Sequence, residues 1–136
     1  MLIVPKPDNL TQPYWDGVAQ HQLRIQQCSD CGNQWHPPLY LCPRCYSKNV
    51  AWVASSGRGT LYSYTVVHHA AHVAVADKVP DLVALVTLHE GPRVVSNLLN
   101  CRTADVRIGM PLKLLFQEIA PGIWLPQFEP AGNALP

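Results

Sequence analysis

Apolar and β-branched residues recur in short runs after residue 50, and glycine, proline and small polar residues separate these runs. Such runs between turn signals are typical of β-strands. The pattern predicts five strands, at 50–53, 60–69, 82–88, 94–99 and 112–118. Residues 55–59 and 89–92 are predicted turns, and residues 103–106 favour one helical turn. The second half of the chain is therefore expected to be a β-structure.

The first half of the chain has a different pattern. Apolar residues at i, i+3 and i+4 spacing predict an amphipathic helix over residues 11–20, with Thr11 as its N-cap. Leu23 and Ile25 then alternate with polar neighbours, which predicts a strand over residues 22–27. A short helix and one strand therefore precede the β-rich half.

Five short strands with one helical turn predict a barrel of the OB-fold type, which is a partly open Greek-key barrel. The length of 136 residues and the hydrophobic share of 48% suit one compact domain or two very small ones. The 13 prolines and 8 glycines argue against a helical bundle. Residues 124–130 carry two large rings between prolines, and we expect them either to close the barrel or to contact another protein.

Four of the five cysteines form two C-x-x-C pairs, Cys28 with Cys31 and Cys42 with Cys45. Two such pairs place four thiolates around one ion and complete a tetrahedral site without another ligand. A closed thiolate site is structural rather than catalytic, because it leaves no position for substrate. We expect one zinc ion here, with iron bound as in rubredoxin as the alternative.

A disulfide is the other use of paired cysteines, and it needs an oxidising compartment. The N-terminal residues 1–7 lack the apolar stretch of a signal peptide, which favours a reduced, cytoplasmic protein. No apolar run approaches 18 residues, so no membrane span is expected. We expect a mainly β chain divided into an N-terminal helical segment at 1–21, a zinc ribbon at 22–50 and an OB-fold barrel with a C-terminal tail at 51–136.

An OB-fold beside a zinc ribbon suggests binding of single-stranded nucleic acid as one function. The charge argues against it: after residue 50 the chain has six basic and six acidic side chains. Binding to a phosphate backbone generally needs a concentrated positive surface. We therefore expect no nucleic acid as partner, and keep this class as the alternative function.

Three histidines gather near one predicted strand end, at His68, His69 and His72. Imidazole titrates near neutral pH and binds metals, so the cluster raises a third reading, an independent metallo-hydrolase. No serine or cysteine motif nearby supplies a nucleophile. A polar strand end or the rim of an interface is the plainer interpretation.

Several short motifs, in their order along the chain, resemble the zinc-ribbon and OB-fold proteins of the DUF35 family. They cover nearly the whole chain, and no single motif is decisive. The motifs are Tyr14-Trp15, Gln27-Cys28-Ser29-Asp30-Cys31-Gly32, Cys42-Pro43-Arg44-Cys45, Ser56-Gly57-Arg58-Gly59 and Ile108-Gly109-Met110-Pro111-Leu112. Asp81 departs from the pattern, which often has an aromatic or apolar residue there.

The resemblance implies an accessory subunit that has no catalytic residues of its own. Members of the family accompany thiolase-like enzymes, which include thiolases, acyltransferases and retro-aldolases that act on acyl-CoA substrates. The expected assembly is a hetero-oligomer in which the partner subunit carries the catalytic residues. The ribbon and helix would then dock on the partner, and the barrel would lie near the entrance for coenzyme A.

Two arginines in predicted turn regions, Arg58 and Arg93, are the candidates to meet a CoA phosphate. A guanidinium group binds phosphate through two parallel hydrogen bonds, which makes arginine suited to this contact. The alternative is that both are solvated loop residues. The sequence does not distinguish which acyl-CoA substrate or which reaction the complex would use.

Overall fold

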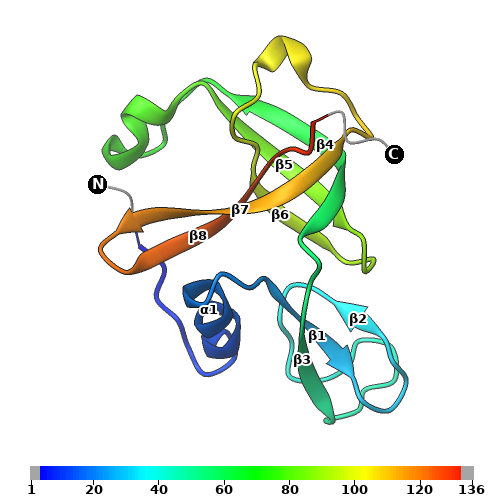
Figure 1. The fold of residues 1–136 in the computed structure, drawn as a ribbon. Helices are drawn as coiled ribbons and strands as arrows, with labels where there is room; N and C mark the ends of the chain where they lie inside the picture. The colour runs from blue at the N-terminus through cyan, green and yellow to red at the C-terminus, as the bar shows by residue number, and fades with distance from the viewer. Residues whose placement is uncertain (1–3, 133–136) are drawn as a thin grey trace.

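The computed structural model describes residues 4–132, which form one short α-helix, two 3-10 helices and two β-sheets (Figure 1). A three-stranded sheet has the order β2-β1-β3, and a five-stranded sheet has the order β6-β5-β4-β7-β8. The elements are α1 (Gln12–Ala19), β1 (Arg24–Cys28), β2 (Gln34–Trp35), β3 (Val50–Ala54), β4 (Arg58–Val67), the 3-10 helix η1 (Val73–Lys78), β5 (Asp81–Leu88), β6 (Arg93–Asn97), the 3-10 helix η2 (Thr103–Asp105), β7 (Pro111–Ala120) and β8 (Ile123–Pro130). The predicted fold class is confirmed. Residues 1–3 and 133–136 of the predicted end segments lie outside the described residues.

Helix α1 begins where predicted, but Thr11 does not cap it through its side chain. The backbone N–H of Thr11 instead donates to Asp8 Oδ1 at 2.8 Å, and the backbone N–H of Asp8 donates to Thr11 Oγ1 at 3.0 Å. This reciprocal pair satisfies donors just before the helix, as a capping box does. On the inner face of the helix, Gly17 and Val18 are buried.

The strand at 50–54 belongs to the ribbon sheet rather than to the barrel. β3 pairs antiparallel with β1, with Ile25 opposite Val53 and Gln27 opposite Ala51. The prediction that residues 50–53 form the first barrel strand is therefore wrong. The pattern of β-branched and aromatic residues indicates a strand but carries no information about which strand lies beside it.

The long strand β4 is the centre of the barrel sheet. It pairs with β5 along its whole length from Gly59 onward, and with β7 at residues 58–60. The close approach at Gly59 leaves no room for a side chain, since an added Cβ would lie 2.7 Å from the Thr87 carbonyl oxygen. Glycine at this position therefore lets β4 and β5 approach each other closely.

The fifth barrel strand is β8, which resolves the two expectations for residues 124–130 in favour of barrel closure. β8 pairs antiparallel with β7, with Phe116 opposite Pro126 and Leu112 opposite Pro130. Its prolines are tolerated because β8 is the last strand in the sheet order, where fewer backbone donors need a partner. The parallel bridge between Leu98 and Phe128 then closes the barrel.

Two groups of buried residues differ greatly in size. The larger group fills the barrel and includes Leu23 and Ile25 of the chain entering the ribbon. The smaller group contains only Cys28, Trp35 and Cys42 among its buried members. The base of the ribbon is therefore held by the barrel core, whereas its outer end has almost no apolar core of its own. None of the helices within residues 4–132 has the length and apolarity needed to cross a membrane.

Candidate functional site

Each cysteine pair forms a tight knuckle with the same hydrogen bonds. In the first, the backbone N–H groups of Asp30 and Cys31 both donate to Cys28 Sγ at 3.4 Å. In the second, the N–H groups of Arg44 and Cys45 donate to Cys42 Sγ at 3.4 and 3.5 Å. Backbone donors directed at sulfur stabilise the thiolate form, which is the form that binds metal.

The residue after each knuckle has a positive φ, 78° at Gly32 and 63° at Tyr46. The Gly32 N–H donates to the Cys28 carbonyl oxygen at 2.9 Å, and the Tyr46 N–H donates to the Cys42 carbonyl oxygen at 2.8 Å. The two knuckles thus have matching backbones, although only the first uses glycine where a left-handed conformation favours it.

The four sulfur atoms lie within 4.8 Å of one another. The Sγ atoms of Cys28 and Cys45 are 3.6 Å apart, as are those of Cys31 and Cys42. Four sulfurs at about 2.3 Å from a tetrahedral zinc ion are about 3.8 Å apart, whereas a disulfide places them at about 2.05 Å. The geometry fits a tetrahedral metal site, and all four cysteines are free thiols.

The four thiols do not ionise equally. Burial opposes ionisation of Cys42, but the N–H groups of Cys45 and Arg44 outweigh burial and lower the pKa of its thiol to about 6. The Ser47 N–H favours the thiolate of Cys45, yet burial and the three neighbouring thiols together raise its pKa to about 12. A bound cation removes this conflict, because it neutralises the charge that the thiolates would otherwise share.

Side-chain hydrogen bonds hold the loops that carry the knuckles. Gln26 is 3% exposed, and its Oε1 accepts from Trp35 Nε1 and from the Leu39 N–H, each at 2.6 Å. Asp30 accepts from the Ser47 hydroxyl and from Asn49 Nδ2. These bonds, led by that of Ser47, keep the pKa of Asp30 below its usual value. Both knuckles are therefore tied to β1 and to each other.

A second candidate site lies on the outer face of the barrel sheet, where Arg58 and Lys113 stand directly opposite each other on β4 and β7. Like charges directly opposite in a sheet are destabilising, so this pair indicates a place for an anion. Lys113 Nζ lies 3.7 Å from Glu129 Oε2, which offsets part of the charge. Among the described residues, Arg58 has no ion-pair partner.

Arg93 lies on the same outer face, two strands away from Arg58. It is opposite Thr87, which is in turn opposite Thr60, and residues 58 and 60 point to the same side of β4. The Arg93 guanidinium lies 3.7 Å from the ring centroid of Tyr62, a cation–π contact. The sheet register thus gathers the two predicted arginines on one surface, although their side chains have different immediate surroundings.

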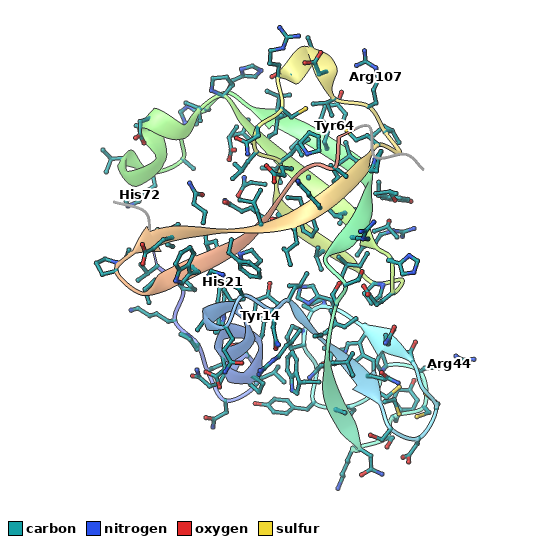
Figure 2. All side chains as sticks on the ribbon, viewed as in Figure 1. Tyr14, His21, Arg44, Tyr64, His72 and Arg107 are labelled. Carbon is teal, nitrogen blue, oxygen red and sulfur yellow. The ribbon has the colours of Figure 1, made fainter. Side chains whose placement is uncertain are left out.

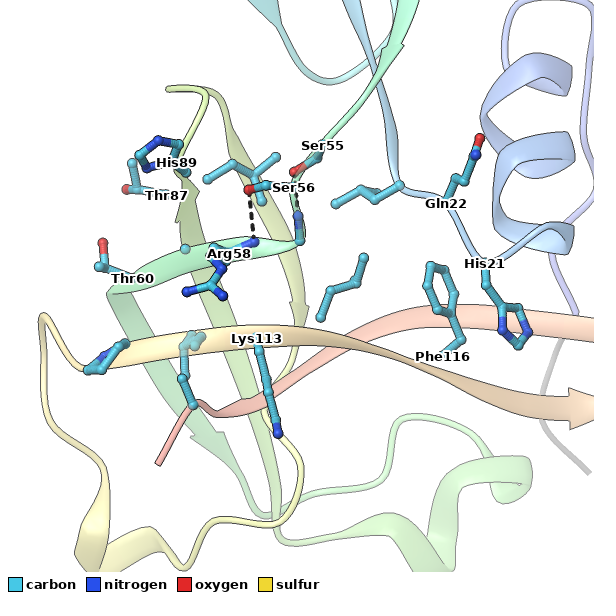
Figure 3. A pocket seen from close by; sticks show the side chains of 18 residues that line it. His21, Gln22, Ser55, Ser56, Arg58, Thr60, Thr87, His89, Lys113 and Phe116 are labelled. Carbon is cyan, nitrogen blue, oxygen red and sulfur yellow. Dashed lines mark hydrogen bonds between the residues drawn. The ribbon is translucent and has the colours of Figure 1, made fainter. Parts of the chain in front are cut away.

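We call the surface formed by Arg58, Arg93 and Lys113 the cationic face. A cleft of about 690 Å³ runs beside it, and both Arg58 and Lys113 line the cleft (Figure 3). His21 and Phe116 lie at its other end, with stacked rings 4.9 Å apart. Sequence reasoning missed Lys113, because its position depends on the pairing of β4 with β7, two strands far apart in the chain.

The three histidines His68, His69 and His72 are exposed. His72 lies beside η1 (Figure 2). Within residues 4–132, the four cysteines are the group of histidine, cysteine and acidic side chains that is arranged to hold a metal ion. The metallo-hydrolase reading therefore gains no support from the structure.

Comparison with known proteins gives a consistent assignment. A family model for "ChsH2, rubredoxin-like zinc ribbon domain" matches residues 15–51, and one for "ChsH2, C-terminal OB-fold domain" matches residues 52–117. A "DUF35 domain-containing scaffold protein" of Methanocaldococcus jannaschii is 33% identical over 117 residues, covering 82% of this chain and 80% of that protein. The chain belongs to the DUF35 family. Its resemblance to the family is therefore confirmed.

Two further similarities are to chains whose descriptions name enzymes. A chain described as "Ltp2-ChsH2(DUF35) aldolase" has 38% sequence identity and a TM-score of 0.86, covering 93% of this chain and 98% of that one. A "Probable enoyl-CoA hydratase alpha subunit" of Thermomonospora curvata is 40% identical over 129 residues. That match covers 93% of this chain but 40% of the hydratase subunit, so the DUF35 protein spans about two fifths of that relative's length.

Proposed function

We propose that this DUF35 protein is a non-catalytic accessory subunit in a complex that acts on acyl-CoA substrates. The observation that carries the proposal is the similarity to the chain described as Ltp2-ChsH2(DUF35) aldolase, which extends over 98% of that chain. The metal site agrees with this role, because the four cysteines would occupy all four coordination positions of a tetrahedral ion and leave none for substrate. The protein's contribution is then to bind and position its partner, in the cytoplasm.

The finer form of the proposal is that the partner is a thiolase-like subunit, which carries the residues that form or break a carbon–carbon bond. The word aldolase in the description of the similar structure supports a reaction of this type. The T. curvata relative supports a second candidate, in which the partner is a hydratase subunit. Both candidates place the DUF35 protein in a hetero-oligomer on an acyl-CoA substrate.

The metal in this proposal is a structural zinc ion held by Cys28, Cys31, Cys42 and Cys45. Thiolate sets of this kind bind zinc or iron, and the match to a zinc-ribbon family model favours zinc. When bound, the ion would supply folding energy and no reaction step. Metal analysis of the purified protein decides between the two ions, with one equivalent of zinc per chain as the expected result.

The cationic face would take the phosphates of coenzyme A at the interface with the partner. Its charge pattern supports this role, since Arg58 and Lys113 are opposite each other and Arg93 lies two strands away. A guanidinium group binds phosphate through two parallel hydrogen bonds, and an ammonium group binds it as a point charge. A single-stranded nucleic acid would use the same cations, but the barrel half of the chain has equal numbers of basic and acidic residues.

Co-purification tests the proposed assembly. The chain is expressed with an affinity handle in its native host, and proteins retained after a high-salt wash are identified by mass spectrometry. A stoichiometric thiolase-like protein supports the finer proposal, and a hydratase subunit supports the second candidate. Recovery of the chain alone, together with salt-dependent binding of an oligonucleotide, would contradict both.

The CoA contact is tested in the complex with the double variant Arg58→Ala/Lys113→Ala. Loss of two phosphate contacts should raise the Michaelis constant for the acyl-CoA about tenfold, equivalent to about 1.4 kcal/mol, and leave kcat unchanged. Arg44→Ala/Lys48→Ala is the matched control, because it removes the same charges from the ribbon, and Arg44 projects from the ribbon's outer end (Figure 2). Equal kinetics in both double variants would mean that Arg58 and Lys113 are solvated surface residues that do not contact coenzyme A.

A further inference from the structure

Two turns that are predicted from the sequence meet in the structure. One is formed by residues 55–57, where the chain passes from the ribbon strand β3 to the barrel strand β4, and we call it the linker turn. The other is formed by residues 89–92, between β5 and β6. The side chain of Glu90 in the second turn reaches the linker turn, although 34 residues separate it from Ser56. This contact joins distant segments, so the sequence alone does not show it.

Both carboxylate oxygens of Glu90 accept hydrogen bonds from the linker turn. Oε1 accepts from the Ser55 hydroxyl and Oε2 accepts from the Ser56 backbone N–H, each at 2.7 Å. Burial raises the pKa of Glu90, but these bonds outweigh burial and lower its pKa overall, so the group is a carboxylate at neutral pH. Among the described residues, Glu90 forms no ion pair with an arginine or a lysine. Its charge is therefore directed at the linker turn rather than at the cationic face.

The two serines extend this anchoring along the chain. Ser55 Oγ accepts from the Gly57 N–H at 3.1 Å, and Ser56 Oγ accepts from the Arg58 N–H at 3.3 Å (Figure 3). The Ser55 N–H donates to the Leu23 carbonyl oxygen at 2.7 Å, which ties the linker turn to the ribbon as well. Three consecutive backbone N–H groups, those of residues 56–58, therefore have side-chain oxygens as acceptors, and these acceptors are connected to Glu90.

Arg58 is the first residue of β4 and belongs to the cationic face. The sheet holds its carbonyl side, because the Arg58 carbonyl oxygen accepts from the His89 N–H at 2.8 Å. Its N–H side is held by the bonds that begin at Glu90. The end of a strand frays when few bonds hold it, so loss of the Glu90 bonds would free the backbone that carries the Arg58 side chain.

We propose that Glu90 is a positioning residue that fixes the linker turn and thereby holds Arg58 on the cationic face. The inference deepens the proposed function and rests on it for the anion that Arg58 would meet. A cation that is already held in place binds an anion more tightly, because its backbone and side chain lose less freedom on binding. The order of the linker turn is a property of this chain alone, so it is tested apart from any partner or substrate.

Amide hydrogen exchange and ¹⁵N relaxation on the full chain measure the order of the linker turn and of the Arg58 side chain. Glu90→Ala removes both acceptors, and the amides of residues 56–58 should then exchange at least about tenfold faster. Glu90→Gln keeps a side chain of the same shape that can still bond to both serines, and should retain most of the protection.

Glu118→Ala is the matched control, because Glu118 Oε2 accepts from the Gly122 N–H at 3.0 Å in a different hairpin. It should leave residues 56–58 unchanged. Unchanged exchange and relaxation of these residues in Glu90→Ala, or equal loosening of them in Glu118→Ala, would overturn the inference.

Pyrophosphate is the probe for the cationic face, and two variants of Glu90 separate geometry from charge. Alanine and glutamine remove the same negative charge, so electrostatics alone predicts that both variants bind the anion equally, and more tightly than the unaltered protein. The positioning role predicts that Glu90→Ala binds pyrophosphate about fivefold more weakly than Glu90→Gln, with the signals of Arg58 and Lys113 shifting during the titration. Equal affinities of the two variants would contradict the positioning role.

Failure of the proposed function gives a different result. If the unaltered protein does not bind pyrophosphate, the proposed contact with coenzyme A fails, and the exchange and relaxation data alone decide whether Glu90 fixes the linker turn and Arg58. If Glu90→Ala loses protection throughout the barrel, Ser55→Ala takes its place, since it removes only the hydroxyl between Glu90 Oε1 and the Gly57 N–H. Faster exchange of the Gly57 amide in Ser55→Ala then supports the inference, and unchanged exchange overturns it.

Discussion

Removal of the metal should unfold the outer end of the ribbon and leave the barrel folded. The outer end has few other sources of stability, because its small core buries only Cys28, Trp35 and Cys42, with Val50 packed against them. Burial of a large side chain such as Trp35 contributes roughly 1.5 to 3 kcal/mol. A structural zinc site contributes about 10 to 16 kcal/mol in isolated zinc-finger peptides, so the metal dominates here. Leu23 anchors the ribbon base in the barrel core instead.

Hydrogen exchange with mass spectrometry on the chelator-treated protein measures this directly. After metal loss is verified by elemental analysis, amides of residues 28–49 should exchange freely, while those of β5 and β7 keep their protection. Cys42→Ser should give the same pattern without a chelator. Cys101→Ser is the control, because Cys101 packs against the barrel core and lies outside the cysteine cluster. Protection of residues 28–49 in the metal-free protein, or loss of protection throughout the barrel, would refute the reasoning.

Two further predictions concern hydrogen bonds that hold the loops. Gln26→Leu leaves the Trp35 indole N–H and the Leu39 N–H unpaired and should lower the free energy of unfolding by about 1 to 3 kcal/mol per donor; a chemical denaturation curve like that of the unaltered protein would contradict this. Burial raises the pKa of Glu90, but hydrogen bonds from the Ser56 backbone N–H and the Ser55 hydroxyl outweigh burial and lower the pKa overall. The stability that the Glu90 carboxylate contributes to the fold is therefore present above pH 4.5 and is lost as the pH falls through its lower folded-state pKa. When melting temperatures are measured across this pH range, Glu90→Gln should lack this loss of stability.

The cysteine cluster was accessible to prediction because its determinants are local. Two C-x-x-C pairs set their own knuckle geometry within a few residues, and the spacing between pairs permits the short strand β2 to return the chain. The capping of α1 was only partly predicted. Thr11 was expected to act as an isolated cap, whereas its bonds are exchanged with Asp8, three residues earlier.

The strand pairings were less accessible, since they depend on contacts between distant segments. β3 was predicted as a strand but assigned to the wrong sheet, because its sequence does not determine which strand pairs with it. β8 was left undecided because its prolines argue against a strand in a sheet interior, and its edge position is set only by the complete fold. Lys113 was missed for the same reason, since the β4–β7 register places it beside Arg58. The assigned segments 1–21, 22–50 and 51–136 stay a prediction.

The most direct test of the accessory role is a turnover assay with separately purified subunits. The DUF35 protein, its partner and the reconstituted complex are each supplied with the acyl-CoA substrate of the partner. The account predicts no turnover by the DUF35 protein alone and a marked gain when it is added to the partner. Turnover by the DUF35 protein alone, or a partner whose rate is unchanged by its addition, would contradict the central claim.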